Sequence, residues 1–388
     1  MSPENIRWTK GCDKMIALAE PNLSGNESEY IRQCMDTNFV SSVGPFVPRF
    51  EEAFAQFVGT PHAVAVSNGT AAIHMALILA GVGPGDEVIV SDFTFAASGN
   101  PIFYQGGTPI LVDSEFDTWN LEPGLVVEEL DRRARLGLRM PKVVLAVHIL
   151  GYPARIEAIA DACDRHGVWL IEDAAEALGA RYTDGPYKGR QVGTIGRIGC
   201  FSFNGNKIMT TGGGGMLVSS DAALAQRAKY LITQAKLPGY AYFHNEVGYN
   251  YRLTNLAAAL GVAQLERLDA FLDKKADIAR TYDEAFQGLE GLRCPPRPTG
   301  LTPTFWLYSV MFSRPWEQPL EQLLKRGVQT RPLWTALHLM PPYQGVPLLG
   351  SGKVSESLCS FGLSLPCSTS LSKKDQAMVI EAVREILK

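Results

Sequence analysis

Residues 142–173 read KVVLAVHILGYPARIEAIADACDRHGVWLIED, in which two short apolar segments flank a stretch of helical character. Apart from Lys142 at the start of KVVLAV and the two acidic residues at the end of VWLIED, both segments are apolar, and they show no alternation of polar and apolar side chains. This pattern is typical of parallel strands that helices cover on both faces. Five more such segments lie between residues 63 and 220: AVAVS, DEVIV, PILVD, GCFSF and GMLVSS. The sequence therefore predicts a doubly wound α/β fold with a mostly parallel central sheet.

The chain beyond Arg252 has a different pattern. Residues 253–286 carry an apolar stripe that predicts one or two long helices, and the proline-rich residues 295–303 interrupt the chain. The strand-like WLYSVMF at residues 306–312 then mixes with helical segments, as in a smaller α+β domain. We expect a large domain over residues 1–262 and a small C-terminal domain over 263–388, which the length of the chain allows.

Composition excludes several classes of protein. A formal net charge of −4 without a long basic run argues against a nucleic-acid or membrane surface. Residues 1–27 lack the continuous apolar region of a targeting segment, and no later run could span a membrane, so we expect a cytoplasmic protein. The seven cysteines never show CxxC spacing and the six histidines form no HExxH motif, so neither a disulfide framework nor a bound metal is expected.

The segment SNGTAAIHMALILAG at residues 67–81 starts where the strand AVAVS ends. Asn68, Gly69 and Thr70 can leave backbone amides free in the first turn of the helix that follows, and such a turn attracts phosphate. The alternative is an ordinary capped helix, because Ser, Asn and Thr are good N-cap residues. The segment lacks the GK[ST] of a nucleotide-binding loop, which argues against nucleoside-phosphate hydrolysis.

Asp173 stands at the end of a strand with four bulky apolar residues, 168–171. A carboxylate at such a place needs a cationic or hydrogen-bonding partner. One interpretation is an N-cap for a helix over residues 175–179, and a sharper one is a partner for the protonated ring nitrogen of an electron-sink cofactor. His148, at the end of the strand KVVLAV, lies near the same ligand or is a buried histidine whose hydrogen bonds are satisfied.

Residues 201–215, FSFNGNKIMTTGGGG, place one lysine before four glycines. Lys207 is either a solvated residue of a surface loop or an amine that condenses with an aldehyde. The glycines allow backbone and ligand to approach closely and tolerate positive φ. A phosphate cradle, a carboxylate for a ring nitrogen and a lysine are the three contacts that pyridoxal phosphate needs. Phe95, in DFTFAAS, could stack on its ring.

Six motifs, in order along the chain, resemble those of the DegT/DnrJ/StrS-type sugar aminotransferases, and the resemblance covers nearly the whole chain. It implies a fold-type I, aspartate aminotransferase-like fold, a Schiff base between pyridoxal phosphate and Lys207, and a homodimer. The motifs are SNGTAAIHMAL, SDFTFAASGNPI, IEDAAEALGA, FSFNGNKIMTTGGGGM, VGYNYRLTNLAAALG and RPLWTALHLMPPY.

The phosphate contacts implied by the resemblance come from four residues of one subunit and one of its partner. Gly69, Thr70, Ala71 and Ser202 would bind the phosphate. Asn250 looks like the residue that the family supplies from the partner subunit, so the active sites would be shared within a homodimer.

The ring and substrate contacts are implied in the same way. Asp173 matches the partner of the ring nitrogen, and Glu176 stands near the ring hydroxyl, where many members have His or Gln. Arg252 would face a carboxylate or the sugar, with a surface salt bridge as the alternative. His338 and Tyr343 resemble a segment that lines the sugar site, and a packed structural role is equally open.

The reaction implied is a transamination in two halves, from L-glutamate to C4 of a nucleotide-linked 4-keto-6-deoxysugar. The amino-acid sequences of the motifs are most similar to those of the branch that acts on UDP-2-acetamido-2,6-dideoxy-4-keto-hexose. A GDP-4-keto-6-deoxymannose 4-aminotransferase, similar to perosamine synthase, is the alternative, although that branch usually has Glu where this chain has Gly213. A non-catalytic binding or regulatory protein of the same fold is a third interpretation.

Overall fold

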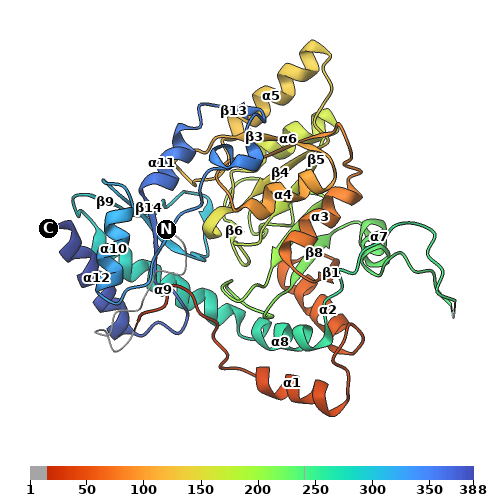
Figure 1. Cartoon of the computed structure of the whole chain (residues 1–388), viewed down its shortest axis with the longest axis horizontal. Helices are drawn as coiled ribbons and strands as arrows, with labels where there is room; N and C mark the ends of the chain where they lie inside the picture. The colour runs from red at the N-terminus through yellow and green to blue at the C-terminus, as the bar shows by residue number, and fades with distance from the viewer. Residues whose placement is uncertain (1–14, 240) are drawn as a thin grey trace.

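The computed structural model describes residues 15–239 and 241–388 (Figure 1). Residues 1–14, which include Cys12, lie outside the described residues. They are the beginning of the segment that we expect to lack a targeting signal. The largest feature is an eight-stranded sheet in which only β8 runs antiparallel to its neighbours. Its spatial order is β1 (His62–Val66), β8 (Gly215–Ser219), β7 (Ile198–Ser202), β5 (Trp169–Asp173), β4 (Val143–Val147), β2 (Glu87–Ser91), β3 (Thr108–Val112) and β13 (Leu348–Leu349). The prediction of a mostly parallel sheet is confirmed.

Both faces of this sheet are apolar and covered by helices. Along β4, Val144 and Ala146 belong to one hydrophobic core, and Val143 and Leu145 belong to another, because successive side chains of a strand point to opposite faces. The first core contains residues of α2 (Phe46–Val58), α5 (Pro123–Leu136), α6 (Glu157–His166) and α8 (Asn255–Leu265). The second contains residues of α3 (Gly69–Leu79), α4 (Ala96–Tyr104) and α7 (Ala222–Ile232). The doubly wound arrangement is therefore confirmed.

The helical prediction for residues 253–286 is also confirmed, as two helices. Thr254 caps α8 by accepting a hydrogen bond from the N–H of Ala257, and α9 (Leu268–Phe286) follows almost at once. α1 (Glu27–Asp36) packs against α8. The buried Asn255 at the start of α8 joins the two helices, since its Nδ2 donates to Sγ of Cys34 in α1, 3.2 Å away.

A second, antiparallel sheet of four strands lies beside α9 (Figure 1). We call this sheet and its helices the small unit. It consists of β12 (Arg331–Pro332), β14 (Gly362–Leu365), β11 (Tyr308–Phe312), β9 (Leu292–Arg293), α10 (Glu317–Lys325), α11 (Lys353–Phe361) and α12 (Lys373–Leu387). The remaining short elements are β6 (Arg181–Tyr182) with β10 (Leu301–Thr302), and the 3-10 turns η2 (Ile149–Gly151), η3 (Leu337–Leu339) and η4 (Pro341–Tyr343).

Two segments cross the boundary expected between residues 262 and 263. Near the N-terminus, Ile16 forms a parallel bridge with Val328, so this segment runs along the small unit. In the other direction, β13 leaves the small unit and pairs with β3 at the edge of the large sheet. The division of the chain at residue 262 stays a prediction.

Some kinds of site are missing from the described residues. Within residues 15–239 and 241–388, no helix is long and apolar enough to cross a bilayer. In these same residues no group of three or more His, Cys, Asp or Glu side chains could hold a metal ion, and the six cysteines have free thiols.

Lys275 joins α9 to the small unit from a buried position. Its Nζ donates hydrogen bonds to the carbonyl oxygens of Trp306 and Cys367, both 2.9 Å away. The side chain is only 5% exposed, so water does not replace these bonds. One amine therefore satisfies two buried acceptors from segments about 60 residues apart.

Lys275→Met is expected to lower the free energy of unfolding by about 3 kcal/mol, because two buried carbonyl groups lose their donor. Urea denaturation followed by circular dichroism measures this change. The matched control is Lys374→Met on the exposed face of α12, which should stay within about 0.5 kcal/mol of the wild type. If the two variants have equal free energies of unfolding, the hydrogen bonds of Lys275 do not stabilise the fold.

Candidate active site

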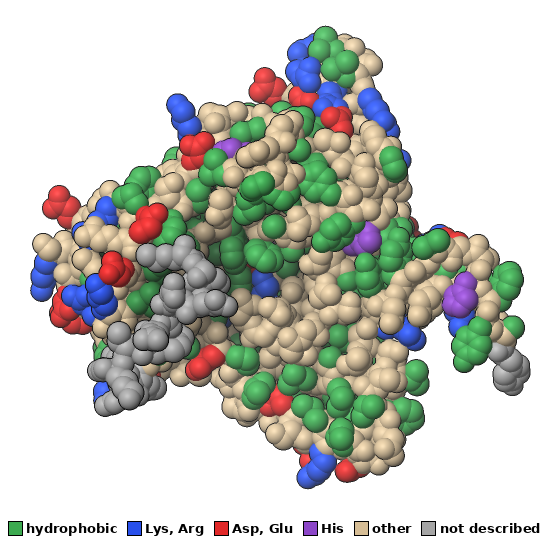
Figure 2. Space-filling model, viewed as in Figure 1, with side chains coloured by type: hydrophobic (Ala, Val, Ile, Leu, Met, Phe, Trp, Pro, Cys, Tyr) green, Lys and Arg blue, Asp and Glu red, His purple; other side chains and the backbone are tan. Residues whose placement is uncertain are grey.

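A cavity of about 850 Å³ lies between the carboxyl ends of the parallel strands and the small unit. Figure 2 shows this face of the molecule hollowed near its centre. The large sheet contributes Gly69 after β1, Asp173 at the end of β5 and Ser202 at the end of β7. The small unit contributes Trp306 and Arg331. Residues of motifs far apart in the sequence therefore meet at one edge of the sheet.

One end of the cavity is the start of α3. Asn68 caps this helix, and its Oδ1 accepts a hydrogen bond from the N–H of Ala71 at 2.8 Å. The N–H groups of Gly69 and Thr70 have no acceptor inside the helix and line the cavity. A Cβ on Gly69 would lie 2.8 Å from Cβ of Ser202, so only glycine lets the helix start approach that side chain. Ala71 does not line the cavity, so the phosphate contact predicted for it is not supported.

The four glycines of residues 212–215 have different functions. Gly212 alone has a positive φ, of 78°, and turns the chain toward β8. Gly215 packs against the turn before α3, where a Cβ would lie 2.6 Å from the carbonyl carbon of Asn68. Gly213 lines the cavity and a Cβ there would meet no atom within 4 Å. The run thus brings β8 against the start of α3 and leaves open space beside Gly213.

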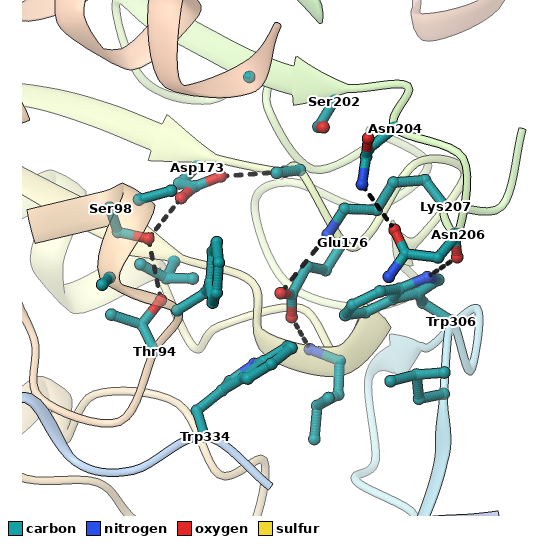
Figure 3. Close-up of a pocket in the computed structure, with 18 of the residues that line it drawn as sticks. Thr94, Ser98, Asp173, Glu176, Ser202, Asn204, Asn206, Lys207, Trp306 and Trp334 are labelled. Carbon is teal, nitrogen blue, oxygen red and sulfur yellow. Dashed lines mark hydrogen bonds and ion pairs between the residues drawn. The ribbon is translucent and has the colours of Figure 1, made fainter. Parts of the chain in front are cut away.

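Asp173 is 4% exposed and its carboxylate is held on two sides (Figure 3). Oδ2 accepts a hydrogen bond from Oγ of Ser98 at 2.7 Å, and Oδ1 accepts from the N–H of Ala175 at 3.0 Å. Since the Ser98 proton points to Asp173, Thr94 donates to Ser98 at 2.9 Å. The N-cap interpretation of Asp173 is wrong, because residues 175–179 form turns and no helix. Sequence reasoning missed Thr94 and Ser98, although the i, i+4 spacing in SDFTFAAS was available as a signal.

Lys207 points into the cavity and is 13% exposed, so the solvated-loop interpretation is wrong. Its Nζ lies 3.6 Å from Oε1 of Glu176 and 3.7 Å above the ring of Trp306, whose Nε1 donates to the carbonyl of Asn206 (Figure 3). Burial lowers the pKa of Lys207, although the charge of Glu176 opposes the shift. Burial likewise raises the pKa of Glu176, against the opposing charge of Lys207 and a hydrogen bond from the N–H of Leu150. Burial therefore favours the neutral form of each group in this pair.

Three aromatic rings form a row along the cavity (Figure 3). The ring centroids of Phe95 and Trp334 are 5.1 Å apart, and those of Trp334 and Trp306 are 6.1 Å apart. Phe95 is 53% exposed, so its ring is free to pack on a flat ligand. The sequence predicted that Phe95 faces the ligand but did not predict this for the two tryptophans. The sequence marked them only by their positions in the segments WLYSVMF and RPLWTALH.

His338 and Tyr343 do not line the cavity, which corrects the prediction that they form the sugar site. Nδ1 of His338 lies 2.7 Å from Oδ2 of the buried Asp92, and Nε2 lies 3.3 Å from Oε1 of Glu356. Burial lowers the pKa of His338, but the hydrogen bonds and negative charges of Asp92 and Glu356 together outweigh this effect, and the net shift is upward. Tyr343 is buried and donates to Oδ1 of Asn100 at 2.7 Å. Both side chains have the packed structural function that the sequence left open.

Asn250 and Arg252 also lie away from the cavity of their own chain. They follow residues 233–239 and 241–249, which project from the body after α7 (Figure 1). Nη2 of Arg252 donates to Oδ1 of Asn250 at 3.3 Å and to Oε1 of Gln234 at 3.4 Å. Their contacts with cofactor and substrate stay predictions.

His148 is a fully buried histidine with satisfied hydrogen bonds, the second of its two interpretations. Its Nδ1 accepts from the N–H of Ala154 at 3.0 Å, so Nε2 carries the proton toward Glu172, also at 3.0 Å. Glu172 in turn accepts hydrogen bonds from the N–H groups of the turn before β7, Gly193 among them. This network fixes the loop between β5 and β7 and does not reach the cavity.

Comparisons with known proteins agree with this geometry. A sequence profile of the DegT/DnrJ/EryC1/StrS aminotransferase family matches residues 21–384. The chain is 41% identical to EpsN of Bacillus subtilis over 376 residues, which is 95% of each chain. It is 39% identical to the GDP-perosamine synthase of Caulobacter vibrioides over 378 residues, or 96% of this chain and 98% of the relative. Among solved structures, the aminotransferase TlmJ from Streptoalloteichus hindustanus superposes with a TM-score of 0.87 at 32% identity, covering 96% of this chain and 98% of TlmJ.

Proposed function

Because the chain belongs to the DegT/DnrJ/EryC1/StrS aminotransferase family, we propose that it moves the amino group of L-glutamate to C4 of a nucleotide-linked 4-keto-6-deoxysugar. The enzyme class and the cofactor follow from the family: the chain is a sugar aminotransferase that depends on pyridoxal phosphate. The observation that carries the proposal is one cavity that brings together Lys207, Asp173 and the start of α3.

The residues of the cavity fit the cofactor. The N–H groups of Gly69 and Thr70, with the hydroxyl of Ser202, form a place for its phosphate. The carboxylate of Asp173 suits its ring nitrogen, and Phe95 can cover its ring. Bound pyridoxal phosphate supplies an electron sink for the carbon that loses its proton.

The protein's own groups then handle the protons. Lys207 would hold the cofactor through its aldehyde carbon, and its Nζ, once the amino group of glutamate has replaced it there, would take the proton from Cα of glutamate. Asp173 keeps the proton on the ring nitrogen, and Ser98 and Ala175 hold its carboxylate in place. Trp306 and Trp334 shield the amine from water on the side of the small unit.

Glu176→Gln is expected to lower the pKa of Lys207 further, because the carboxylate that stabilises its ammonium form is gone. The fraction of neutral, reactive amine increases as the pH rises through this pKa, so the variant should react at a lower pH than the wild type. The rate at which cofactor-free protein forms a borohydride-fixable adduct with pyridoxal phosphate, measured against pH, tests this expectation. An unchanged or higher midpoint would contradict it.

The proposed nucleotide is UDP, and the proposed sugar is a 2-acetamido-2,6-dideoxy-4-keto-hexose. Gly213 supports this choice over a GDP-linked sugar, since perosamine synthase-like members usually have Glu there. The open space beside Gly213 allows a larger side chain in such members. The second candidate is a GDP-linked 4-keto-6-deoxymannose, which the 39% identity to a GDP-perosamine synthase favours.

The decisive experiment incubates the loaded enzyme with glutamate and UDP-, GDP- and dTDP-linked 4-keto sugars and follows the mass of the products. Turnover of the UDP-linked acetamido sugar alone is expected. Turnover restricted to GDP- or dTDP-linked sugars would overturn the proposed nucleotide and leave the reaction in place. Absence of any amino sugar product would overturn the reaction itself.

We also propose a homodimer with shared active sites. Asn250 does not reach the cavity of its own chain, and the projecting segment beside it exposes Tyr242, Phe243 and Val247, of which Tyr242 is 86% exposed. Such an exposed apolar surface suits burial against a second copy.

Mixing two inactive variants, Lys207→Ala and Asn250→Ala, is expected to restore about a quarter of the wild-type activity. Random exchange puts half of the subunits into mixed dimers, and each mixed dimer then has one intact site. Activity assays after partial unfolding and refolding of the mixture measure this recovery. No recovery in mixtures that do contain mixed dimers would place Asn250 in the site of its own chain.

A further inference from the structure

Arg331 is a cation of the cavity that the proposed reaction has not yet used. Among the described residues that line the cavity, the basic side chains are Lys207 and Arg331. Lys207 is paired with Glu176, whereas the side chain of Arg331 is exposed and forms no ion pair or hydrogen bond with the described part of the chain. An unpaired guanidinium facing a ligand cavity is a ready partner for an anion.

The backbone holds Arg331 in a fixed place. It begins β12 and pairs with Ser364 of β14. Thr330 before it is fully buried, while Gln329 lines the cavity, so Gln329 and Arg331 face the same side as alternating residues of extended chain do. Oε1 of Gln329 accepts from the N–H of Leu18 at 3.0 Å, which leaves its amide N–H groups as donors beside the guanidinium.

The charged side chains around the cavity favour the wall formed by the small unit as the place where a substrate anion binds. Asp173 and Glu176 lie on the wall formed by the large sheet and repel a negative group there. The start of α3 is the proposed place of the cofactor's phosphate. Arg252, predicted to face a substrate carboxylate, does not line the cavity. Among the described residues of the chain's own cavity lining, Arg331 is therefore the unpaired cation that faces the substrates, and a contact from Arg252 would have to come from the partner subunit.

We propose that Arg331, with the amide of Gln329, forms the subsite that binds an anionic group of the substrates. This inference rests on the proposed function, whose two substrates both carry such groups: the carboxylates of glutamate and the diphosphate of the sugar nucleotide. Both groups match the planar fork of a guanidinium through two parallel hydrogen bonds. The two substrates bind in turn, so one subsite can serve either or both.

Calorimetric titration of the pyridoxal phosphate-loaded protein tests the subsite without turnover. The probes are glutarate, which has the carboxylates of glutamate but no amine, and UDP and GDP, which have the diphosphate but no sugar. Arg331→Gln is expected to raise the Kd of at least one probe class by about 10- to 100-fold. Arg331→Lys should lose less, because it keeps the charge without the fork. Arg135→Gln, an exposed arginine of α5 that does not line the cavity, is the control and should bind both probes like the wild type.

The outcomes separate the two sources of the anion. Weaker binding of glutarate alone assigns the subsite to the amino donor, and weaker binding of the nucleotides alone assigns it to the sugar nucleotide. Either result supports the subsite. Wild-type binding of both probe classes by Arg331→Gln, or no binding of either class by the wild type, overturns it.

Failure of this inference and of the proposed function are distinguishable. If the wild type forms no borohydride-fixable adduct with pyridoxal phosphate, the proposed function fails. If the wild type makes amino sugar and Arg331→Gln binds every probe normally, only the subsite fails. Equal melting temperature and cofactor absorbance in wild type and variant exclude a folding defect, and Arg331→Lys provides the second variant.

Discussion

Lys207→Ala is expected to lower the rate of amino transfer by about 10⁴-fold or more, because one substitution removes both the nucleophile and the proton carrier. The variant should also lose the borohydride-fixable bond to the cofactor. It should nevertheless fold, since the Lys207 side chain contacts cavity residues and contributes little to the hydrophobic cores. The measurements are steady-state activity, the absorbance of the bound cofactor and the mass of the reduced protein.

Lys188→Ala is the matched control for this variant, since Lys188 is an exposed lysine far from the cavity lining. The control should keep wild-type activity and a wild-type mass shift after borohydride treatment. If the Lys207→Ala protein keeps more than about one hundredth of the wild-type activity, Lys207 is not the catalytic amine.

Asp173→Asn is expected to lower the rate by about 10³-fold, because a neutral amide does not hold the proton on the ring nitrogen and the electron sink weakens. The fold should survive. The amide oxygen of asparagine can still accept the hydrogen bond from the N–H of Ala175, and its NH2 group can donate to the hydroxyl of Ser98, whose own proton is free to rotate away. The measurements are kcat for the glutamate half of the reaction and the affinity for the cofactor.

Ser98→Ala distinguishes the effect of the negative charge of Asp173 from the effect of holding its carboxylate in position. It removes the 2.7 Å hydrogen bond to Asp173 and leaves the carboxylate in place, so its loss should be about 10-fold. If Asp173→Asn were no slower than Ser98→Ala, the carboxylate would serve only to hold the loop after β5. The proposed electronic function of Asp173 would then be abandoned.

The large sheet and the residues at its strand ends were predictable because their signal is local. A strand such as β5 is apolar over Trp169–Ile171, and its polar residues, Glu172 and Asp173, come at its carboxyl end. Parallel strands end at the same edge, so Gly69, Asp173 and Ser202 meet even though about 130 residues separate the first from the last. Lys207 follows β7 by five residues and stays at that edge.

The wall formed by the small unit was not predictable in the same way. Whether Trp306, Trp334 or Arg331 faces the cavity depends on how the second sheet packs against the first, which no short pattern records. His338 illustrates the error in the other direction, since its place beside the sugar-site motif suggested a ligand contact. The buried carboxylate of Asp92, 246 positions earlier in the chain, binds it instead.

The segment around Ile16 has a consequence for engineering. Its backbone bonds tie it to the small unit: the N–H of Ile16 donates to Gly327, and its carbonyl accepts from Gln329. Leu18 and Ala19, just beyond, line the cavity. A chimera that imports the C-terminal part of a relative in order to redirect sugar choice therefore needs two grafts. Residues 15–19 must be exchanged together with that C-terminal part. Otherwise the original residues 15–19 would pack against a cavity lining that comes from another protein.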